Sequence, residues 1–260
     1  MPRSSHASAR KKPAAPRPRP GRPRKQDPAA GGAEALGPER ILRATLALID
    51  AKGLAAFNIR ELALALGVFP AAIYWHVPSR DALVSGAIAL ALDGVADGLP
   101  QGSWQLRLGA LLRQFREALR RHPQLAPVVA SELACNASFD APMLDQVVAA
   151  LDEARFEGDA LVDAFNVVIA AMCGFATLEL STAPAAAAAS WEAACRARID
   201  ALDPLRAPHL SRHMKDLRNR AFLLRWSGGR EQPLESGFEA WIDVVLRGLE
   251  ARSRALRRGG

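Results

Sequence analysis

His209 and His213 are the pair of residues in this sequence with the clearest metal-ligand spacing. They lie four residues apart in a segment that we expect to be helical, which would place both rings on one helix face. No Glu follows His209 as it would in the zinc-protease pattern, and no third ligand is evident. Gly228-Gly229 fits a loop between helices, and we find no nucleophile elbow, phosphate-cradling loop or paired acid-base carboxylates. We therefore expect no metal, no cofactor and no enzymatic activity.

Tyr74, Trp75 and His76 form a second cluster, because each side chain combines a flat ring with a polar atom. Ile73 and Val77 flank them four residues apart, so these two can supply the buried contacts of a short helix. The three rings would then lie on its free face and have a binding role. The competing interpretation is an aromatic patch packed inside a helical bundle.

The elements that would position these rings are three short helices and a connector between residues 38 and 92. Pro38 fits the first position of a helix, and Gly53 ends it. Asn58 precedes Glu61 by three residues, which is the spacing of a capping box and opens a second helix. Gly67 fits the left-handed position that ends this second helix.

The third helix begins after a short turn. Pro70 is pre-set to open it, and Val77-Pro78 closes it, because a residue before proline is disfavoured in the helical region. Ser79 then caps a fourth helix. A capped helix, a glycine turn and a proline-opened helix are typical of a helix-turn-helix, which presents its second helix to the major groove of DNA.

The residues of this region resemble the TetR family of regulators, and the Tyr-Trp-His-Val stretch is most similar to its tetracycline-repressor branch. The matching runs are Arg60-Glu61-Leu62-Ala63, Leu66-Gly67-Val68, Ile73-Tyr74-Trp75-His76-Val77 and Ala82-Leu83. The resemblance is strong over residues 38–92 and weaker to about residue 255. It implies a ligand-responsive transcriptional repressor that binds double-stranded operator DNA.

Carried over to the matching positions, the resemblance implies a set of DNA contacts. Tyr74 and His76 would hold phosphate oxygens, and Trp75 would pack against sugar or a base. Arg60 and Arg80 would reach phosphates or a base edge, unless they are ordinary solvated surface charges. The four positions after the turn, Phe69 to Ala72, are apolar here, whereas the family usually has polar residues there. Recognition of bases at these positions would therefore use apolar contacts, for example with thymine methyl groups. The predicted set is Asn58, Arg60, Phe69, Pro70, Ala71, Ala72, Tyr74, Trp75, His76 and Arg80, with Arg22 and Arg24 from the N-terminal segment.

Residues 1–37 account for the net positive charge of the chain. The first 28 residues contain nine Lys or Arg against Asp27 alone, whereas the whole chain has a formal net charge of +7. The segment is rich in Pro, Ala and Gly and has no apolar periodicity, which predicts a disordered basic arm. Its run from Pro20 to Lys25 is similar to an AT-hook, whose arginines enter a narrow A·T minor groove, although Pro20 replaces the first arginine. A generic basic tail is the alternative, and either would add salt-sensitive DNA affinity.

Alanine and leucine dominate the composition, while β-branched residues are sparse, which predicts an all-α fold. We expect an N-terminal three-helix helix-turn-helix domain at 38–92 and a larger helical domain at 103–255. Helical stretches of the second domain are expected near 103–121, 140–156, 160–181, 186–202, 208–224 and 235–255. The resemblance implies that this second domain binds an inducer and forms a homodimer.

Two of these stretches fit the dimer contact. Residues 160–181 are almost uninterruptedly apolar, and residues 235–255 repeat apolar side chains at spacings of three and four. Paired with their mates, they would form a four-helix interface; burial within one subunit is the alternative. A two-fold dimer would require a near-palindromic operator with half-sites roughly 34 Å apart.

The resemblance does not extend to the magnesium-tetracycline ligand. An ungapped match keeps Phe115 but places Leu111, Val129 and Glu132 where the branch has an amide, a metal-ligating imidazole and a hydroxyl. A magnesium chelate needs oxygen or imidazole ligands, so we expect a small apolar or amphipathic inducer instead. The predicted ligand residues are Phe115, Val129, Glu132, Met143, Asn166 and Met172, with ordinary core packing as the alternative for each.

Cys135, Cys173 and Cys195 are odd in number and form no C-x-x-C pair, which disfavours a disulfide framework or zinc module and favours a reducing cytoplasm. No uninterrupted apolar run approaches the roughly 18 residues of a membrane span, and no signal peptide is evident, so we expect no membrane association. Two other functions remain open. The chain could be a helical small-molecule-binding or scaffold protein with a degenerate DNA-binding domain, or an architectural protein that binds DNA through the arm alone.

Overall fold

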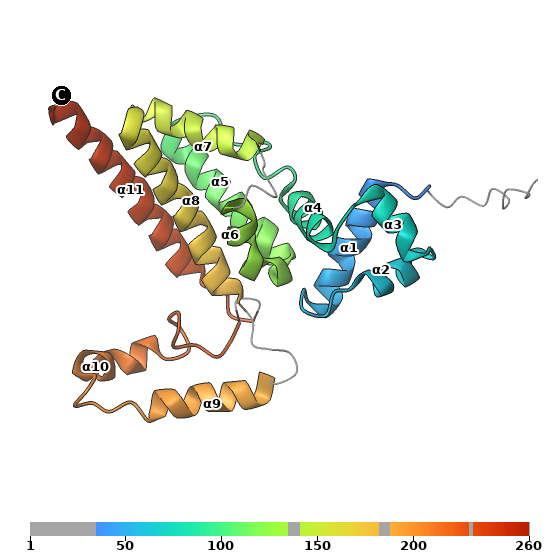
Figure 1. The fold of residues 1–260 in the computed structure, drawn as a ribbon. Helices are drawn as coiled ribbons and strands as arrows, with labels where there is room; N and C mark the ends of the chain where they lie inside the picture. Colours follow the sequence, from blue (N-terminus) through green and yellow to red (C-terminus); the bar gives the residue numbers. More distant parts are fainter. Residues whose placement is uncertain (1–34, 135–140, 182–187, 229–230, 260) are drawn as a thin grey trace, which may run out of the picture. The chain divides into compact units, whose positions relative to one another are not determined.

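The computed structural model describes residues 35–134, 141–181, 188–228 and 231–259, and every regular element in these ranges is helical (Figure 1). The all-α fold predicted above is confirmed. In chain order the elements are α1 (Pro38–Lys52), α2 (Ile59–Leu66), α3 (Pro70–His76), α4 (Arg80–Leu92), α5 (Trp104–Arg121), the 3₁₀ turn η1 (Pro123–Leu125), α6 (Ala126–Ala134), α7 (Ala141–Glu153), α8 (Gly158–Leu180), α9 (Ala188–Asp200), α10 (Pro208–Leu217) and α11 (Glu235–Gly259).

The first four helices begin and end through the local signals of their sequence. The Asn58 side chain accepts a hydrogen bond from the Glu61 backbone N–H at 3.0 Å and caps α2. Ser79 caps α4 in the same way, through the N–H of Ala82 at 3.0 Å. Gly67 ends α2 with φ of 68°, a left-handed backbone that costs glycine little. The turn between α2 and α3 is therefore fixed locally.

These four helices share one apolar core. Helix α1 packs against α4 and α2, and α2 packs against α3. Ile41 and Ile49 of α1, Leu62 of α2, Ile73 of α3 and Leu83 of α4 are all fully buried. Because each helix contributes a fully buried side chain, the position of α3 is set by tertiary packing as well as by its caps.

Helix α8 is central to the rest of the described chain. It contacts α5, α6, α7 and α11, and α11 also contacts α5 (Figure 1). By length and composition alone α8 is apolar enough to cross a membrane, although Asp159, Asp163 and Glu179 interrupt its apolar run. The helix packs against four other helices, which accounts for the apolar residues on its buried side. A core helix can be as long and as apolar as a membrane-spanning one.

The structure also corrects the expected helices in two places. Residues 123–134 form η1 and α6, where no helix was expected. Helix α10 ends at Leu217, seven residues before the expected end. Asn219, with φ of 55°, follows this end, and its side-chain oxygen accepts hydrogen bonds from the N–H groups of Trp226 and Ser227, both at 3.0 Å. These contacts stabilise a loop in place of a longer helix.

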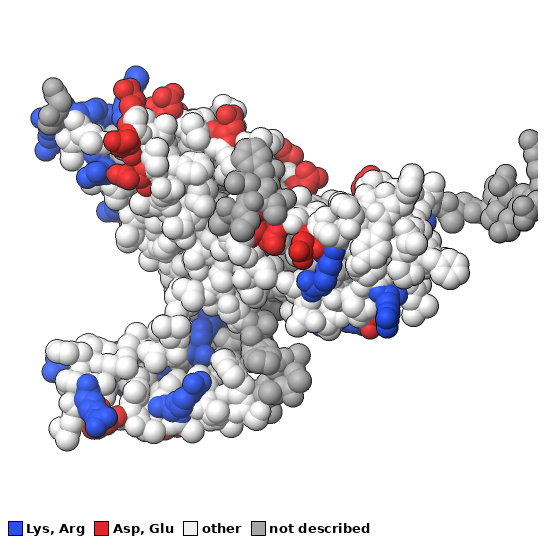
Figure 2. All heavy atoms as spheres, viewed as in Figure 1, with Lys and Arg blue, Asp and Glu red and all other residues white. Residues whose placement is uncertain are grey.

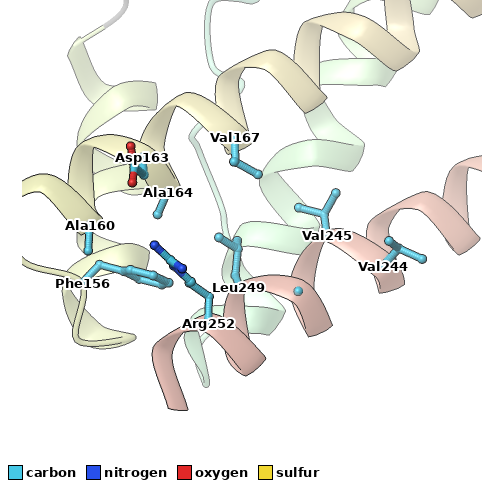
Figure 3. Close-up of a pocket in the computed structure, with 10 residues that line it drawn as sticks. Phe156, Ala160, Asp163, Ala164, Val167, Val244, Val245, Leu249 and Arg252 are labelled. Carbon is cyan, nitrogen blue, oxygen red and sulfur yellow. The ribbon is translucent and has the colours of Figure 1, made fainter. Parts of the chain in front are cut away.

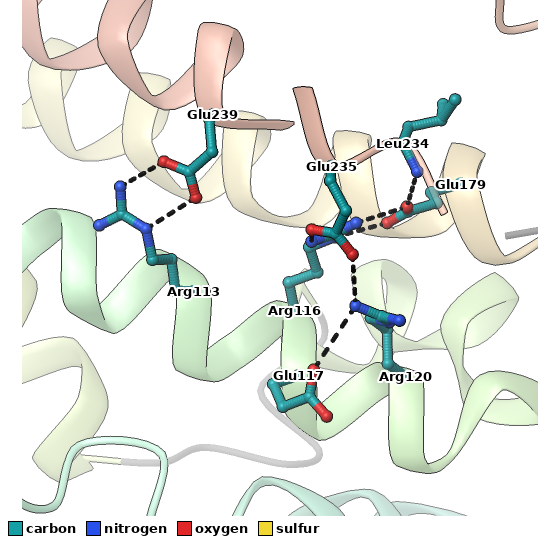
Figure 4. Close-up of polar contacts among 8 residues, drawn as sticks. All are labelled: Arg113, Arg116, Glu117, Arg120, Glu179, Leu234, Glu235 and Glu239. Carbon is teal, nitrogen blue, oxygen red and sulfur yellow. Dashed lines mark hydrogen bonds and ion pairs between the residues drawn. The ribbon is translucent and has the colours of Figure 1, made fainter. Parts of the chain in front are cut away.

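A buried ion network joins α5, α8 and the start of α11 (Figure 4). Arg116 donates to both carboxylate oxygens of Glu179, at 2.7 and 2.6 Å, and to Glu235 at 2.7 Å. The side chain of Glu179 is fully buried and that of Arg116 nearly so. Burial by itself would lower the pKa of Arg116, but the hydrogen bonds and charges of Glu179 and Glu235 outweigh burial and raise it. Each buried charge is therefore compensated by its partner.

Candidate nucleic-acid interface

Helix α3 has one buried face and one open face. Ile73 and Val77 are buried, as the spacing predicted, whereas Trp75 exposes 86% of its surface and Tyr74 46%. His76 is half-buried. The aromatic cluster therefore does not pack inside the bundle. It forms a surface to which another molecule can bind.

The N-terminal end of α3 is apolar and open. Phe69 precedes the helix and is 84% exposed, Ala71 is exposed, and Pro70 and Ala72 are half-buried. Covering an apolar side chain as exposed as Phe69 removes it from water and so stabilises a complex with a partner. Phe69, Ala71 and Trp75 thus give this end of the domain several apolar contacts for a flat or grooved partner.

A shallow groove beside α3 brings together several of the predicted DNA contacts. It is lined by Phe57, Asn58, Ile59, Arg60, Glu61, Pro70, Tyr74 and Arg80. Phe57 and Ile59, which flank the Asn58 cap, were not among the residues predicted from the sequence. Their positions next to the Asn58 cap in the sequence could have indicated that they line the same groove.

The two arginines of this groove differ. Arg80 donates to the backbone oxygen of Leu54 at 3.2 Å and lies 5.5 Å above the centroid of the Phe57 ring. It is therefore held by its own domain. Arg60 is exposed and has no carboxylate partner among the residues that the structure describes, so its charge is available to an anion.

Positive charge is sparse on the first four helices. Lys52 pairs with Glu61 at 2.8 Å, and Arg43 pairs with Glu39 at 3.3 Å. On the face shown in Figure 2, the surface of α1–α4 is mostly uncharged. Apolar contact therefore has a larger part in this surface than charge. Arg22 and Arg24, the other two predicted contacts, lie outside the described residues.

Two family models match the chain over these helices and beyond. Residues 41–87 match the model described as "Bacterial regulatory proteins, tetR family". Residues 98–252 match "Tetracyclin repressor-like, C-terminal domain", which covers more than half of the chain. This chain belongs to the TetR family.

Individual repressors are similar to this chain over only about 90 to 110 residues. The HTH-type transcriptional repressor DrrR1 of Streptomyces coeruleorubidus is 32% identical over 108 residues, 39% of this chain and 38% of that protein. The class A tetracycline repressor from transposon 1721 of Escherichia coli is 33% identical over 87 residues, 32% of this chain and 40% of that protein. Each match thus spans about two fifths of the relative's length.

Solved structures of TetR-family proteins share the fold. ActR of Streptomyces coelicolor in complex with (S)-DNPA has a TM-score of 0.63 at 18% identity, over 85% of this chain and all of that one. BioQ with its double-stranded DNA operator has a TM-score of 0.52 at 24% identity, over 56% of this chain and 87% of that one. At these identities the likeness concerns the fold.

The six residues predicted to bind a ligand in this TetR-family chain do not share one environment. Phe115, Val129, Met143 and Met172 are buried in the core. Asn166 is exposed on α8. Glu132 is half-buried and accepts a hydrogen bond from Ser85 of α4 at 2.7 Å. The structure thus gives Glu132 a partner in the DNA-binding region.

A cavity of about 480 Å³ lies between α8 and α11 of this TetR-family protein, and side chains of both helices face it (Figure 3). It is lined by Phe156, Ala160, Asp163, Ala164, Val167, Val244, Val245, Gly248, Leu249 and Arg252. Val167 and Val244 remain 50% and 69% exposed. The two helices predicted to form the dimer contact therefore carry uncovered apolar surface.

The histidines with metal-ligand spacing, His209 and His213, are both exposed on α10. Within the described ranges, no group of three or more His, Cys, Asp or Glu is arranged to hold a metal ion. Cys173 and Cys195 are buried free thiols, and burial raises the pKa of Cys173 to about 11. Cys135 lies outside the described residues.

Proposed function

We propose that this TetR-family protein is a ligand-responsive repressor that binds a near-palindromic operator as a homodimer. One observation carries the proposal. Helix α3 buries Ile73 and Val77 and leaves Tyr74 and Trp75 on an open face beside the exposed Phe69. A helix held in this way can enter a major groove as a rigid element.

The chemistry of the α3 surface supports a division of labour in DNA binding. The Tyr74 hydroxyl and the His76 ring can hold phosphate oxygens, which positions the protein without reading sequence. Phe69 and Ala71 carry no hydrogen-bonding side chain, so they would distinguish bases by contact with thymine methyl groups. Arg60 and Arg80 line the same groove and would add phosphate contacts, with Arg80 held in place by Leu54 and Phe57.

Uncovered apolar surface on α8 and α11 supports the homodimer. Val162 and Val167 of α8 and Val244 of α11 are each at least half exposed. Only a third of the most apolar window of α8 is buried in a single chain. Burying apolar surface stabilises by about 25 cal/mol per Å², so two copies that pair these helices as a four-helix bundle remove the exposed surface from water.

Two solved relatives support a ligand-responsive mechanism, and we propose that it operates in the cytoplasm. ActR is known in complex with (S)-DNPA and BioQ with an operator. The contact between Glu132 of α6 and Ser85 of α4 is one route by which a ligand in the larger domain would change the DNA-binding helices. We propose a small apolar or amphipathic inducer, and a regulator without enzymatic activity.

A gel-shift titration of the full chain with DNA from upstream of its own gene tests the proposal. We expect a discrete complex that Tyr74→Ala/His76→Ala weakens about tenfold or more, since two phosphate contacts are lost. The matched control is Leu205→Ala, which truncates a side chain that is 92% exposed outside α1–α4. Unchanged binding by the double variant would indicate DNA binding by the arm alone. No complex with any upstream fragment would favour a scaffold or binding protein with a degenerate DNA-binding domain.

A further inference from the structure

A second cavity, of about 380 Å³, lies between the C-terminal end of α8, α9 and the loop that precedes α11. We call it the α8–α9 cavity. It is lined by Leu178, Glu179, Ser181, Trp191, Cys195, Arg198, Leu223, Arg225, Trp226, Ser227 and Gly228. Its size falls within the range of about 300–1,000 Å³ that is usual for small-molecule sites.

Arg225 is the unusual residue of this cavity, because its guanidinium is buried and incompletely bonded. The residue is 9% exposed. Its Nε donates to the backbone oxygen of Ser227 at 2.7 Å and its Nη2 to that of Gln232 at 2.6 Å. Its Nη1 is buried without a hydrogen-bond partner among the described residues. A buried charged group with an unmet donor is costly, which favours an acceptor from outside the chain.

Glu179, the carboxylate whose charge acts on Arg225, does not meet this need. Both oxygens of Glu179 accept from Arg116, and one also accepts from the Leu234 N–H at 2.8 Å (Figure 4). Burial lowers the pKa of Arg225, and the charge of Glu179 offsets this only in part. The positive charge of Arg225 is therefore under-compensated.

The other arginines around the cavity divide into paired and unpaired ones. Arg196 pairs with Glu192, and Arg218 pairs with Asp200 at 2.7 Å. Arg198 lines the cavity, is exposed, and has no carboxylate partner in the part of the chain described. Two guanidinium groups without carboxylate partners thus border the cavity, and an anion would neutralise them.

The remaining walls suit the apolar body of such an anion. Leu178, Trp191, Leu223 and Trp226 all line the cavity. The Trp226 ring is held by the guanidinium groups of Arg196 and Arg218, at 4.5 and 5.4 Å from its centroid. A cavity with flat apolar walls and a few charged groups selects an amphipathic ligand.

We propose that the α8–α9 cavity binds a small organic anion, a carboxylate on a flat apolar body, with Arg225 and Arg198 as its counter-charges. The carboxylate would lie beside the guanidinium groups of Arg225 and Arg198, and the body would lie against Trp191 and Trp226. Binding of the anion does not depend on the proposed function; only its effect on DNA binding does. The cavity does not include the predicted ligand residues Phe115 and Val129.

Calorimetric titration of the full chain without DNA tests the inference, with 2-naphthoate and its neutral analogue 2-naphthamide as probes. We expect the carboxylate to bind at least about tenfold more tightly than the amide, since a charge-assisted hydrogen bond is lost in the amide. Arg225→Lys should reduce 2-naphthoate affinity about tenfold, and Arg198→Gln by less, because Arg198 is solvated. Arg206→Gln, in the exposed segment between α9 and α10, is the matched control and should bind like the original chain.

Equal affinity for the two probes, no binding of either up to its solubility, or unchanged 2-naphthoate affinity in both variants would overturn the inference. A thermal melt of Arg225→Lys distinguishes loss of binding from loss of folding. Arg198→Gln provides a second test that leaves the buried hydrogen bonds intact. Because no DNA is present, failure to bind an operator in a gel shift would refute the proposed function and leave this inference standing.

Discussion

Phe69 and Trp75 each expose more than four fifths of their surface beside a helix whose opposite face is fully buried. Neither ring is needed to fill the core, so contact with DNA is the proposed reason for both. The same residues limit how bases are recognised. An apolar ring has no directional donor or acceptor, and the thymine methyl is the apolar group that the major groove presents.

Replacing thymine by uracil in the operator tests this form of recognition. We expect each methyl in contact with Phe69 or Ala71 to contribute about 0.8 kcal/mol, so its removal weakens binding about fourfold. Phe69→Ala should bind more weakly but become less sensitive to the substitution. Fluorescence anisotropy with matched thymine and uracil duplexes measures both. Equal affinities for the two duplexes in the original chain would rule out methyl recognition.

Some features of individual site residues could be predicted from the sequence, and others could not. The Asn58 cap and the buried positions of Ile73 and Val77 followed from local spacing. The contacts of Arg80 with Leu54 and Phe57 did not, because they form between segments whose separation depends on tertiary packing. Arg80 is exposed and lines the groove as well, so its contact with DNA stays a prediction.

Among the helices, α5, α8 and α11 are joined by charges that lie far apart in the sequence. Arg116 and Glu179 are 63 residues apart, and Glu235 is a further 56 residues along. No local pattern predicts such a pairing. The shortened α10 has a similar cause, since its end depends on the hydrogen bonds of Asn219 to a later loop. Local caps predicted the first four helices well because their ends are determined locally.

Glu179→Gln tests the importance of the buried pair. We expect the free energy of unfolding to fall by about 3 kcal/mol, because Arg116 keeps a buried charge that Glu235 compensates only in part. Arg116→Met/Glu179→Leu should be less destabilised than Glu179→Gln, since it removes both charges. The control is Glu239→Gln, which breaks the half-exposed pair with Arg113 and should cost about 1 kcal/mol or less. Urea unfolding followed by circular dichroism measures all three. A double variant less stable than Glu179→Gln would contradict this account.

In the whole molecule, DNA binding depends on the proposed pairing of two chains. Val167→Glu/Val244→Glu places charges on the exposed apolar surface of α8 and α11. We expect this variant to sediment as a monomer and to lose at least about tenfold in operator affinity, because one chain can occupy only one half-site. Leu205→Glu, at an exposed leucine outside α8 and α11, should remain a dimer. A double variant that stays dimeric would place the interface elsewhere.

The N-terminal segment is predicted to contribute salt-sensitive affinity for DNA. Deleting residues 1–28 removes nine basic residues. We expect weaker binding and a flatter dependence of log affinity on log salt concentration, because fewer counterions are released from DNA. Titrations at several salt concentrations compare the two slopes. An unchanged slope would show that the arm does not contact phosphate.

Footprinting of the full chain on DNA upstream of its own gene tests the central claim most directly. The account predicts protection of two half-sites related by near two-fold symmetry and separated by about one helical turn, roughly 10 base pairs. At the same protein concentration, Tyr74→Ala/His76→Ala should give no protection. Protection that the double variant retains, or the absence of any protected site, would contradict the role assigned to α3.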